Sequence, residues 1–146
     1  MALIILLRHG DAEPDSGAGD SARELTEKGE VQALCAGSTL AALGLEPEVC
    51  LTSPKKRALQ TAELACQSLG IAPVTETALA EPDHRVEDLS AGWKSALLVG
   101  HEPMMSAEVS RLTGGSVKFR KGGLAIIDGH RLTLLAGPDL TGLAAD

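Results

Sequence analysis

Leu3-Ile4-Ile5-Leu6-Leu7-Arg8-His9-Gly10 is the stretch of sequence that decides the fold. Its five consecutive aliphatic residues leave no polar face, which is typical of a central strand covered on both sides. The run lacks the basic n-region of a signal peptide and is too short for one. It ends on a cation, an imidazole and a glycine, so we expect a buried strand that delivers polar side chains at its carboxyl end.

Strand and helix patterns alternate outward from this strand. Short aliphatic runs predict further strands at 48–51, 73–75, 96–99, 124–127 and 131–135, the last two forming a hairpin. Cap and glycine signals predict helices at about 27–44, 54–70 and 104–113. The alternation predicts a single α/β domain over residues 1–146, a three-layer sandwich with a central, mostly parallel sheet flanked by helices.

The same patterns predict details of the helices. Thr26 is expected to cap the first helix, with Val31 and Leu34 on or near its buried face. Ser53 and Pro54 are expected to be the N-cap and the first residue of the second helix. The polar stretch 81–92 is compatible with a short helix.

Composition restricts both the core and the partners. With 44% hydrophobic residues but only one Trp, one Phe and no Tyr, the core must be aliphatic. The formal net charge of −7 argues against a general nucleic-acid binder, which needs a basic face. No segment approaches the ~20 apolar residues that cross a bilayer, so we expect neither nucleic acid nor membrane as a partner. The three cysteines lie in apolar stretches without metal-ligand spacing, which indicates free thiols in a reducing, cytoplasmic setting.

Three predicted strand ends carry residues that suit an anion. In an open α/β sheet, ligands bind beyond the carboxyl ends of the strands, so side chains that follow different strands meet there. The groups concerned are Arg8-His9-Gly10, Ser53 with Arg57, and Gly100-His101. Two arginines, two histidines and a helix N-terminus at one edge of the sheet predict a phosphate pocket.

These residue types fit phosphoryl transfer. Guanidinium groups bind phosphate oxygens bidentately and stay charged at any working pH. A neutral imidazole is a competent nucleophile near pH 7, and a second, protonated imidazole can donate to the oxygens on which charge accumulates. Gly10 and Gly100 would let the backbone approach the anion. Because cations are already present, we expect no metal and no other cofactor.

The same segments resemble a known family. Arg8-His9-Gly10 after an N-terminal strand is similar to the signature of the histidine phosphatase superfamily, which includes the phosphoglycerate mutases. Leu25-Thr26-Glu27-Lys28-Gly29 resembles the family's first-helix start. Residues 52–62 resemble its second-arginine motif, and Val99-Gly100-His101-Glu102-Pro103 its second-histidine motif. The motifs occur in the family's order across most of the chain.

Within that superfamily, the short length and Arg8-His9-Gly10-Asp11-Ala12 look most like the SixA-type phosphohistidine phosphatases. The resemblance implies a phosphoglycerate mutase-like fold and a phosphorylated substrate, for which a phosphohistidine protein is one candidate. It implies His9 as the nucleophile, with Arg8, Arg57 and His101 holding the phosphoryl group. Further candidates for the phosphate site are Gly10, Ser53, Gly100 and Asp11.

A general acid would decide which leaving group the site can expel. Leu79-Ala80-Glu81 resembles one form of the family's acid motif, so Glu81 is the candidate. The following Pro82-Asp83-His84-Arg85 departs from the family's glycine-rich continuation, and SixA-type members generally lack the acid. An alkoxide needs a proton in order to leave, whereas imidazole leaves more readily. A site without an acid therefore favours phosphohistidine over phosphate esters.

Two alternatives stay open at this point. One is a phosphatase of small phosphate esters that uses Glu81 as its acid. The other, from a different class, is a phosphate- or phosphoprotein-binding module without turnover. A complete Arg-His-Arg-His set argues against pure binding, which has no use for a nucleophile. A metal site on His9 and His101 lacks both helical ligand spacing and a carboxylate partner set.

Several polar residues have less defined expectations. Asp11 either orients a catalytic group or is simply solvated in its loop. His84 and His130 are expected to be solvated. Residues 15–21 are expected to form a mobile loop that could fold over a substrate.

Overall fold

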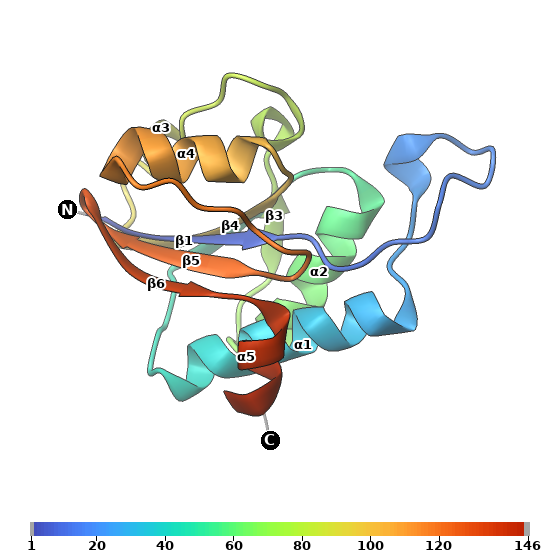
Figure 1. The fold of residues 1–146 in the computed structure, drawn as a ribbon, viewed down its shortest axis with the longest axis horizontal. Coiled ribbons are helices and arrows are strands. Elements are labelled where there is room, and N and C mark those ends of the chain that lie inside the picture. Colours follow the sequence, from blue (N-terminus) through green and yellow to red (C-terminus); the bar gives the residue numbers. More distant parts are fainter. Residues whose placement is uncertain (1, 145–146) are drawn as a thin grey trace.

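The structure, a computed structural model, describes residues 2–144 and arranges them in three layers (Figure 1). One sheet contains the strands β1 (Leu3–Arg8), β2 (Val49–Thr52), β3 (Pro73–Thr75), β4 (Ser95–Gly100), β5 (Leu124–Asp128) and β6 (Arg131–Ala136). The helices are α1 (Glu27–Ala42), α2 (Lys56–Gln67), α3 (Val86–Leu89), α4 (Met104–Thr113) and α5 (Pro138–Ala144), with 3₁₀ turns η1 (Asp20–Ala22) and η2 (Thr77–Ala80). Within the described residues, no helix is long and apolar enough to cross a membrane.

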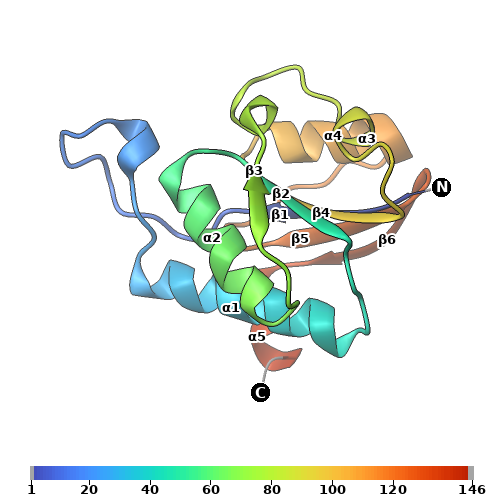
Figure 2. The same ribbon diagram turned by 180° about the vertical axis from the view of Figure 1, so that it is seen from behind.

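The sheet has the strand order β3-β2-β4-β1-β5-β6. Strands β1 to β4 are parallel, whereas β5 pairs antiparallel with both β1 and β6. Helices α1, α2 and α5 cover one face of the sheet, and α3 and α4 cover the other (Figure 1 and Figure 2). The predicted sandwich with a mostly parallel sheet and a C-terminal hairpin is therefore confirmed.

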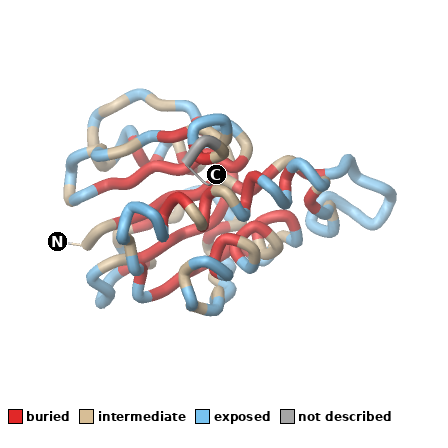
Figure 3. The backbone as a smooth tube through the Cα atoms, turned by 90° about the horizontal axis from the view of Figure 1, so that it is seen from below, coloured by how far each residue is buried: buried red, intermediate tan, exposed pale blue. Residues whose placement is uncertain are grey.

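Strand β1 lies between β4 and β5 in the sheet, and its middle residues are buried (Figure 3) because helices cover both faces of the sheet. Ile5 and Leu7 belong to the core that includes residues of α1 and α2, while Ile4 and Leu6 belong to the core on the α3 and α4 side. Consecutive side chains of a strand point to opposite faces, so only an unbroken aliphatic run satisfies both cores. The register pairs Arg8 with Gly100, which places the end of β1 beside the end of β4.

Helix α1 begins as predicted, but its buried face differs from the prediction. The Thr26 hydroxyl accepts a hydrogen bond from the Gly29 amide at 3.0 Å, which is an N-cap. Val31 and Leu34 are 58% and 37% exposed, so their predicted burial is wrong. The residues that α1 buries are mostly small and include Ala33, Ala36 and Gly37. Small residues occupy the buried face of α1 because they let this helix lie close against α2.

Replacing Gly37 with alanine is expected to destabilise the fold, although alanine ordinarily favours a helix by about 1 kcal/mol. A Cβ at this position would lie 2.2 Å from the Ala65 carbonyl oxygen of α2. The two helices would have to separate, at a cost of about 1–3 kcal/mol. Gly142→Ala in α5, where nothing lies within 4 Å of the added Cβ, is the matched control. Urea unfolding measures both variants, and an equal effect at the two positions would contradict the close approach of α1 and α2.

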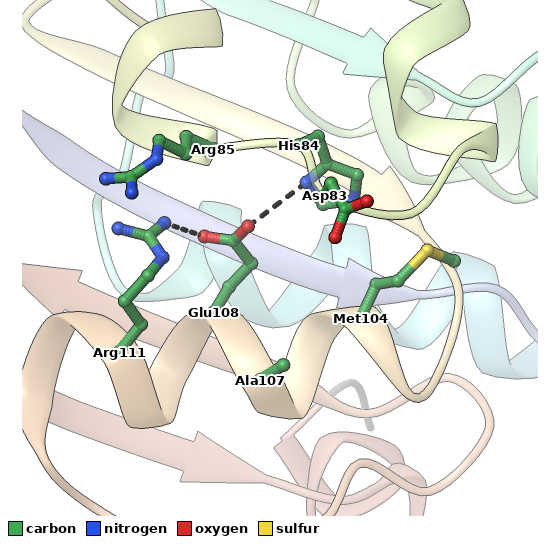
Figure 4. Close-up of a pocket in the computed structure, with 7 residues that line it drawn as sticks. All are labelled: Asp83, His84, Arg85, Met104, Ala107, Glu108 and Arg111. Carbon is green, nitrogen blue, oxygen red and sulfur yellow. Dashed lines mark hydrogen bonds and ion pairs between the residues drawn. The ribbon is translucent and has the colours of Figure 1, made fainter.

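His84 is not solvated, contrary to the sequence-based expectation. Its side chain is 3% exposed, and its Nδ1 lies 3.2 Å from the Glu108 Oε1 of α4. Figure 4 shows the pair beside a cavity of about 320 Å³, with Arg111 on the other carboxylate oxygen of Glu108. Burying a carboxylate requires such partners, so the polar segment before α3 is fixed against α4. His130, in contrast, is exposed as expected.

Candidate active site

The structure brings together three of the side chains that the sequence assigned to different strand ends. His9 follows β1, Arg57 lies in the first turn of α2 after β2, and His101 follows β4. The two imidazole rings have their centroids 5.2 Å apart, and Arg57 Nε donates to His9 Nε2 at 3.4 Å. All three residues are at most 6% exposed. The parallel strands therefore converge as the rule for open sheets predicts.

Backbone contacts fix the orientation of His9. Its Nδ1 lies 2.7 Å from the Gly10 carbonyl oxygen, which can only accept a hydrogen bond. Nδ1 must therefore carry the proton, and in the neutral ring the lone pair is on Nε2. The His9 amide donates to the Gly100 carbonyl, and its carbonyl accepts from the Gly122 amide. The ring is thus held with Nε2 toward Arg57.

The hydroxyl of Thr61 connects helix α2 to the loop after β1, next to His9 and Arg57. Thr61, one turn after Arg57, donates its hydroxyl to the Arg57 carbonyl at 2.7 Å. The same hydroxyl accepts from the Gly10 amide at 3.0 Å. The distance between the His9 loop and the first turn of α2 is therefore set by a single threonine.

His101 has one nitrogen that is paired and one that is not. Its Nε2 lies 2.7 Å from the Ser53 hydroxyl, and the oxygen of that hydroxyl accepts from the Lys55 amide. His101 Nδ1 and Arg8 Nε are buried and have no hydrogen-bond partner within the described part of the chain. Another nitrogen of Arg8 donates to the Phe119 carbonyl at 2.8 Å. Buried polar atoms are rarely left unpaired, so two such atoms in one site indicate that it is built to receive a hydrogen-bonding ligand.

Ser53 and the two glycines have contacts that the sequence did not predict. Ser53 and Pro54 do not begin α2, because Lys55 is the N-cap and the Ser53 hydroxyl is held against His101. The Gly10 amide is engaged by Thr61, and a Cβ at Gly10 would lie 2.6 Å from the Gly29 carbonyl oxygen. A Cβ at Gly100 would lie 2.8 Å from the Met105 methyl group. Close packing against backbone thus requires glycine at position 10, whereas at position 100 the close atom is the end of a flexible side chain. The approach of both backbones to an anion stays a prediction.

Asp11 is neither solvated nor directed at the histidines. Its carboxylate accepts from the Thr26 hydroxyl at 2.8 Å and from Lys121 Nζ at 3.2 Å. The hydrogen bond from Thr26 is the main cause that lowers the pKa of Asp11. In this structure Asp11 joins the loop after β1 to the start of α1, and its role in phosphate binding stays a prediction.

The carboxylates near the site differ in what they contact. Glu102 accepts from the Ser106 amide at 2.8 Å and from the Phe119 amide at 3.3 Å, so it caps α4 and holds the segment that Arg8 contacts. Glu81 is exposed at the end of η2. Within the described residues, only its backbone amide forms a hydrogen bond, and its carboxylate forms none. Neither glutamate forms a hydrogen bond with the histidines in the described residues.

Burial keeps both histidines neutral. Desolvation is the largest cause that lowers the pKa of His9 to about 4; the Gly10 carbonyl opposes it, and the charges of Arg57, Arg8 and Arg23 add to it. Desolvation also lowers the pKa of His101 to about 3, with His9 and Arg57 contributing. A neutral His9 has its Nε2 lone pair available throughout the physiological range.

We expect the C2–H resonances of both histidines to titrate below pH 5 in an anion-free NMR titration, well below the ordinary value of about 6.5. Protons bind the unfolded chain first as the pH falls, because the folded pKa values are about 4 for His9 and about 3 for His101. These residues should therefore lower the free energy of unfolding progressively as the pH falls from about 6.5 toward 3. Normal titration of His9 would contradict its desolvation.

Three charged residues of the site were not among its predicted members. Asp20 of η1 accepts from Arg57 through its carbonyl at 2.9 Å and through its carboxylate at 3.2 Å. Lys55 and Arg23 lie 3.4 and 3.3 Å from the same carboxylate. Residues 15–21 were expected to form a mobile loop, and their sequence has no periodic pattern that would indicate a docked acid. The pairing of Arg23 with Asp20, three residues apart, was the only local signal.

The described residues contain no group of three or more His, Cys, Asp or Glu side chains placed to hold a metal ion. The nitrogen donors of the site are instead arranged around His9. Such a set of buried, preorganised donors suits a tetrahedral oxyanion, whose oxygens accept several hydrogen bonds at once.

Comparison with known families gives one clear match. The model of the histidine phosphatase superfamily (branch 1) matches residues 4–90, which is more than half of the chain. An uncharacterised protein of Picosynechococcus sp. is 34% identical over 134 residues, covering 83% of this chain and 81% of that protein. A 2,3-bisphosphoglycerate-dependent phosphoglycerate mutase of Sphingopyxis alaskensis is 36% identical over 48% of this chain. The match spans only about a third (32%) of that mutase's length.

Solved structures of similar fold include two SixA proteins. The structure of the protein histidine phosphatase SixA complexed with tungstate has a TM-score of 0.83 and 27% identity, covering 94% of this chain and 98% of that one. A protein of Agrobacterium tumefaciens assigned as the phosphohistidine phosphatase SixA has a TM-score of 0.81 and 26% identity, with the same coverage. A mycobacterial glucosyl-3-phosphoglycerate phosphatase, at 18% identity and a TM-score of 0.74, shares the fold.

Proposed function

Because the chain belongs to the histidine phosphatase superfamily, we propose that it is a metal-independent phosphatase with His9 as its nucleophile, and that it acts on phosphohistidine in preference to phosphate esters. The observation that carries the proposal is the neutral, backbone-oriented His9, whose Nε2 faces Arg57 and lies beside a second histidine with an unpaired nitrogen. A binding module needs cations around an anion but has no use for such an oriented lone pair.

The proposed first step transfers the phosphoryl group to the protein. The His9 Nε2 lone pair forms a bond to phosphorus while the bond from phosphorus to the leaving nitrogen breaks. Arg57 and Arg8 would neutralise the charge on the equatorial oxygens, and His101 Nδ1 would donate to one of them. For His101 to donate there, Ser53 must donate its hydroxyl to His101 Nε2, which the 2.7 Å distance allows. The Gly10 carbonyl stabilises the positive charge that His9 gains.

The second step returns the protein to its resting state. Water attacks phosphorus, the bond from phosphorus to Nε2 breaks, and the electron pair returns to the ring. The proton released by water is taken up by the phosphate product, so inorganic phosphate leaves and neutral His9 is restored. The depressed pKa of His9, about 4, favours this return because the neutral ring is its stable form.

The preference for phosphohistidine is inferred from the carboxylates. Asp20 is held ionised by its cationic neighbours, and Glu102 is occupied by Ser106 and Phe119. Neither is arranged to protonate an alkoxide, the poor leaving group of an ester. A phosphohistidine whose second ring nitrogen is protonated expels a neutral imidazole and needs no such donor. A phosphorylated histidine on a protein is therefore the substrate class that this site fits best.

We expect a phosphohistidine peptide to be hydrolysed at least about 10²-fold faster, in kcat/KM, than a phosphoserine peptide, whose alkoxide needs a proton in order to leave, with chelator present throughout. Glu81→Gln should change neither rate by more than about threefold. Comparable turnover of the ester that Glu81→Gln abolishes would instead assign the chain to phosphate-ester phosphatases, with Glu81 as the acid. Loss of activity on chelation would contradict the metal-independent reaction.

A further inference from the structure

Asp20 binds the far edge of the Arg57 guanidinium. Its backbone carbonyl accepts from Nη1 at 2.9 Å, and its carboxylate accepts from Nη2 at 3.2 Å. A guanidinium is planar and carries five N–H donors in a fixed arrangement. Two acceptors on the Nη1 and Nη2 edge therefore fix the rotation of the whole group. The edge that remains carries Nε, which lies 3.4 Å from His9 Nε2.

The segment that carries Asp20 is built to present it. Asp15 accepts from the amides of Gly17 and Gly19 at 2.9 and 3.0 Å. Both glycines have φ above 100°, a conformation that other residues rarely adopt. The chain then forms η1, which begins at Asp20 and lies against α2. The segment projects from the body of the molecule (blue in Figure 1), and its 3₁₀ turn η1 contacts α2.

The charges around Asp20 are unbalanced in favour of cations. Its carboxylate is within 3.4 Å of nitrogen atoms of Lys55, Arg23 and Arg57, and it remains 54% exposed. Partial desolvation opposes ionisation of Asp20, but hydrogen bonds from Arg23 and Arg57 outweigh it and lower its pKa to about 2. Asp20 therefore holds three cations in place while leaving them a net positive charge for a phosphoryl group.

We propose that Asp20 is a positioning residue for the phosphoryl transfer: it clamps the outer edge of Arg57 so that the Nε edge faces the phosphoryl group on His9. The inference rests on the proposed function of the site. Asp20 acts through Arg57 and takes no part in bond making or breaking. Because it is an anion next to the cations that bind phosphate, it also weakens their attraction for a free anion.

These two effects predict opposite changes when the charge is removed. In Asp20→Asn, the backbone carbonyl still accepts from Arg57, but the ionic half of the clamp is lost. We expect kcat for phosphohistidine to fall about 10- to 10²-fold, since small misplacements of a catalytic group have effects of this size. Inorganic phosphate, followed by calorimetry, should bind as tightly as in the parent protein or up to about tenfold more tightly. A purely structural role would weaken both.

Two comparisons separate positioning from loop stability. Asp15→Asn removes the charge of the other structural carboxylate of the same segment, but the asparagine Oδ1 can still accept from the Gly17 and Gly19 amides. It should therefore leave kcat within about threefold. In an Arg57→Lys background, Asp20→Asn should cause no further loss, because a residue that acts through another is silent once that residue is gone. Equal losses from Asp15→Asn and Asp20→Asn, or additive losses with Arg57→Lys, would overturn the proposal.

A spectroscopic readout keeps the inference testable without turnover. Hydrogen bonds at both Nη atoms slow rotation about the Cζ–Nη bonds of Arg57, which ¹⁵N NMR of the guanidinium measures in the anion-free protein. Asp20→Asn should speed this rotation, whereas Asp15→Asn should not. If the parent protein hydrolyses neither phosphohistidine nor a phosphate ester, the proposed function fails. The comparison of Arg57 rotation in the two variants still tests whether Asp20 fixes the guanidinium. Unchanged rotation in Asp20→Asn would overturn the clamp even in a fully active enzyme.

Discussion

Alanine in place of His9 is expected to eliminate turnover, with a loss of at least about 10⁴-fold in kcat, because no other group of the site has a lone pair oriented for attack on phosphorus. The parent protein, quenched in alkali during hydrolysis of labelled phosphohistidine, should retain label that acid releases, as expected of a phosphoramidate. The variant should retain none. The structural reason is the 2.7 Å contact of His9 Nδ1 with the Gly10 carbonyl, which commits Nε2 to the substrate side.

The fold should survive this substitution. His9 is buried, and its desolvation disfavours the folded state in acid. The acid-unfolding midpoint of His9→Ala should therefore move to lower pH. His130→Ala, at an exposed histidine outside the site, is the matched control and should retain full activity. Persistent turnover by folded His9→Ala would rule out the proposed nucleophile.

Sequence patterns were sufficient for the architecture because each strand carries its own burial signal. The aliphatic run in β1 and the runs in β2 and β4 specify strands covered on both faces, and their shared direction brings their polar ends together. The convergence of His9 and His101 followed from that rule, and the choice of Arg57 also depended on its position in the second-arginine motif. The C-terminal hairpin likewise followed from two apolar runs around a glycine turn.

The sequence-based predictions that were wrong have a common physical origin, since each concerns a residue whose partner is distant in sequence. His84 was expected to be solvated because its neighbours are polar, yet it is buried by Glu108, 24 residues away. The buried face of α1 depends on how closely α2 approaches at Gly37. Ser53 was predicted to cap α2, but its hydroxyl contacts His101, which lies 48 residues away. Short-range patterns carry no information on such pairings.

Asp20 is the most consequential of these omissions, because it changes what Arg57 can do. The sequence assigned residues 15–21 to a mobile loop on the basis of glycine and small polar residues. The structure instead uses those glycines to return the chain to the site. A guanidinium held on one edge by the protein has only its other edge for the substrate, so both the position and the planarity of Arg57 become important.

Arg57→Lys, which keeps the charge, is therefore expected to lower kcat about 10²- to 10³-fold, comparable with the loss of a preorganised charge-stabilising donor elsewhere. Lysine provides a single ammonium and cannot contact Asp20 with two nitrogens while directing a third at the phosphoryl group. Lys56→Gln is the matched control, since this adjacent cation pairs with Glu24 on the surface. It should leave kcat/KM within about twofold. Stopped-flow measurement of phosphoenzyme formation distinguishes the variants, and a small effect of Arg57→Lys on that step would mean that charge alone, rather than the oriented fork, stabilises the transferring group.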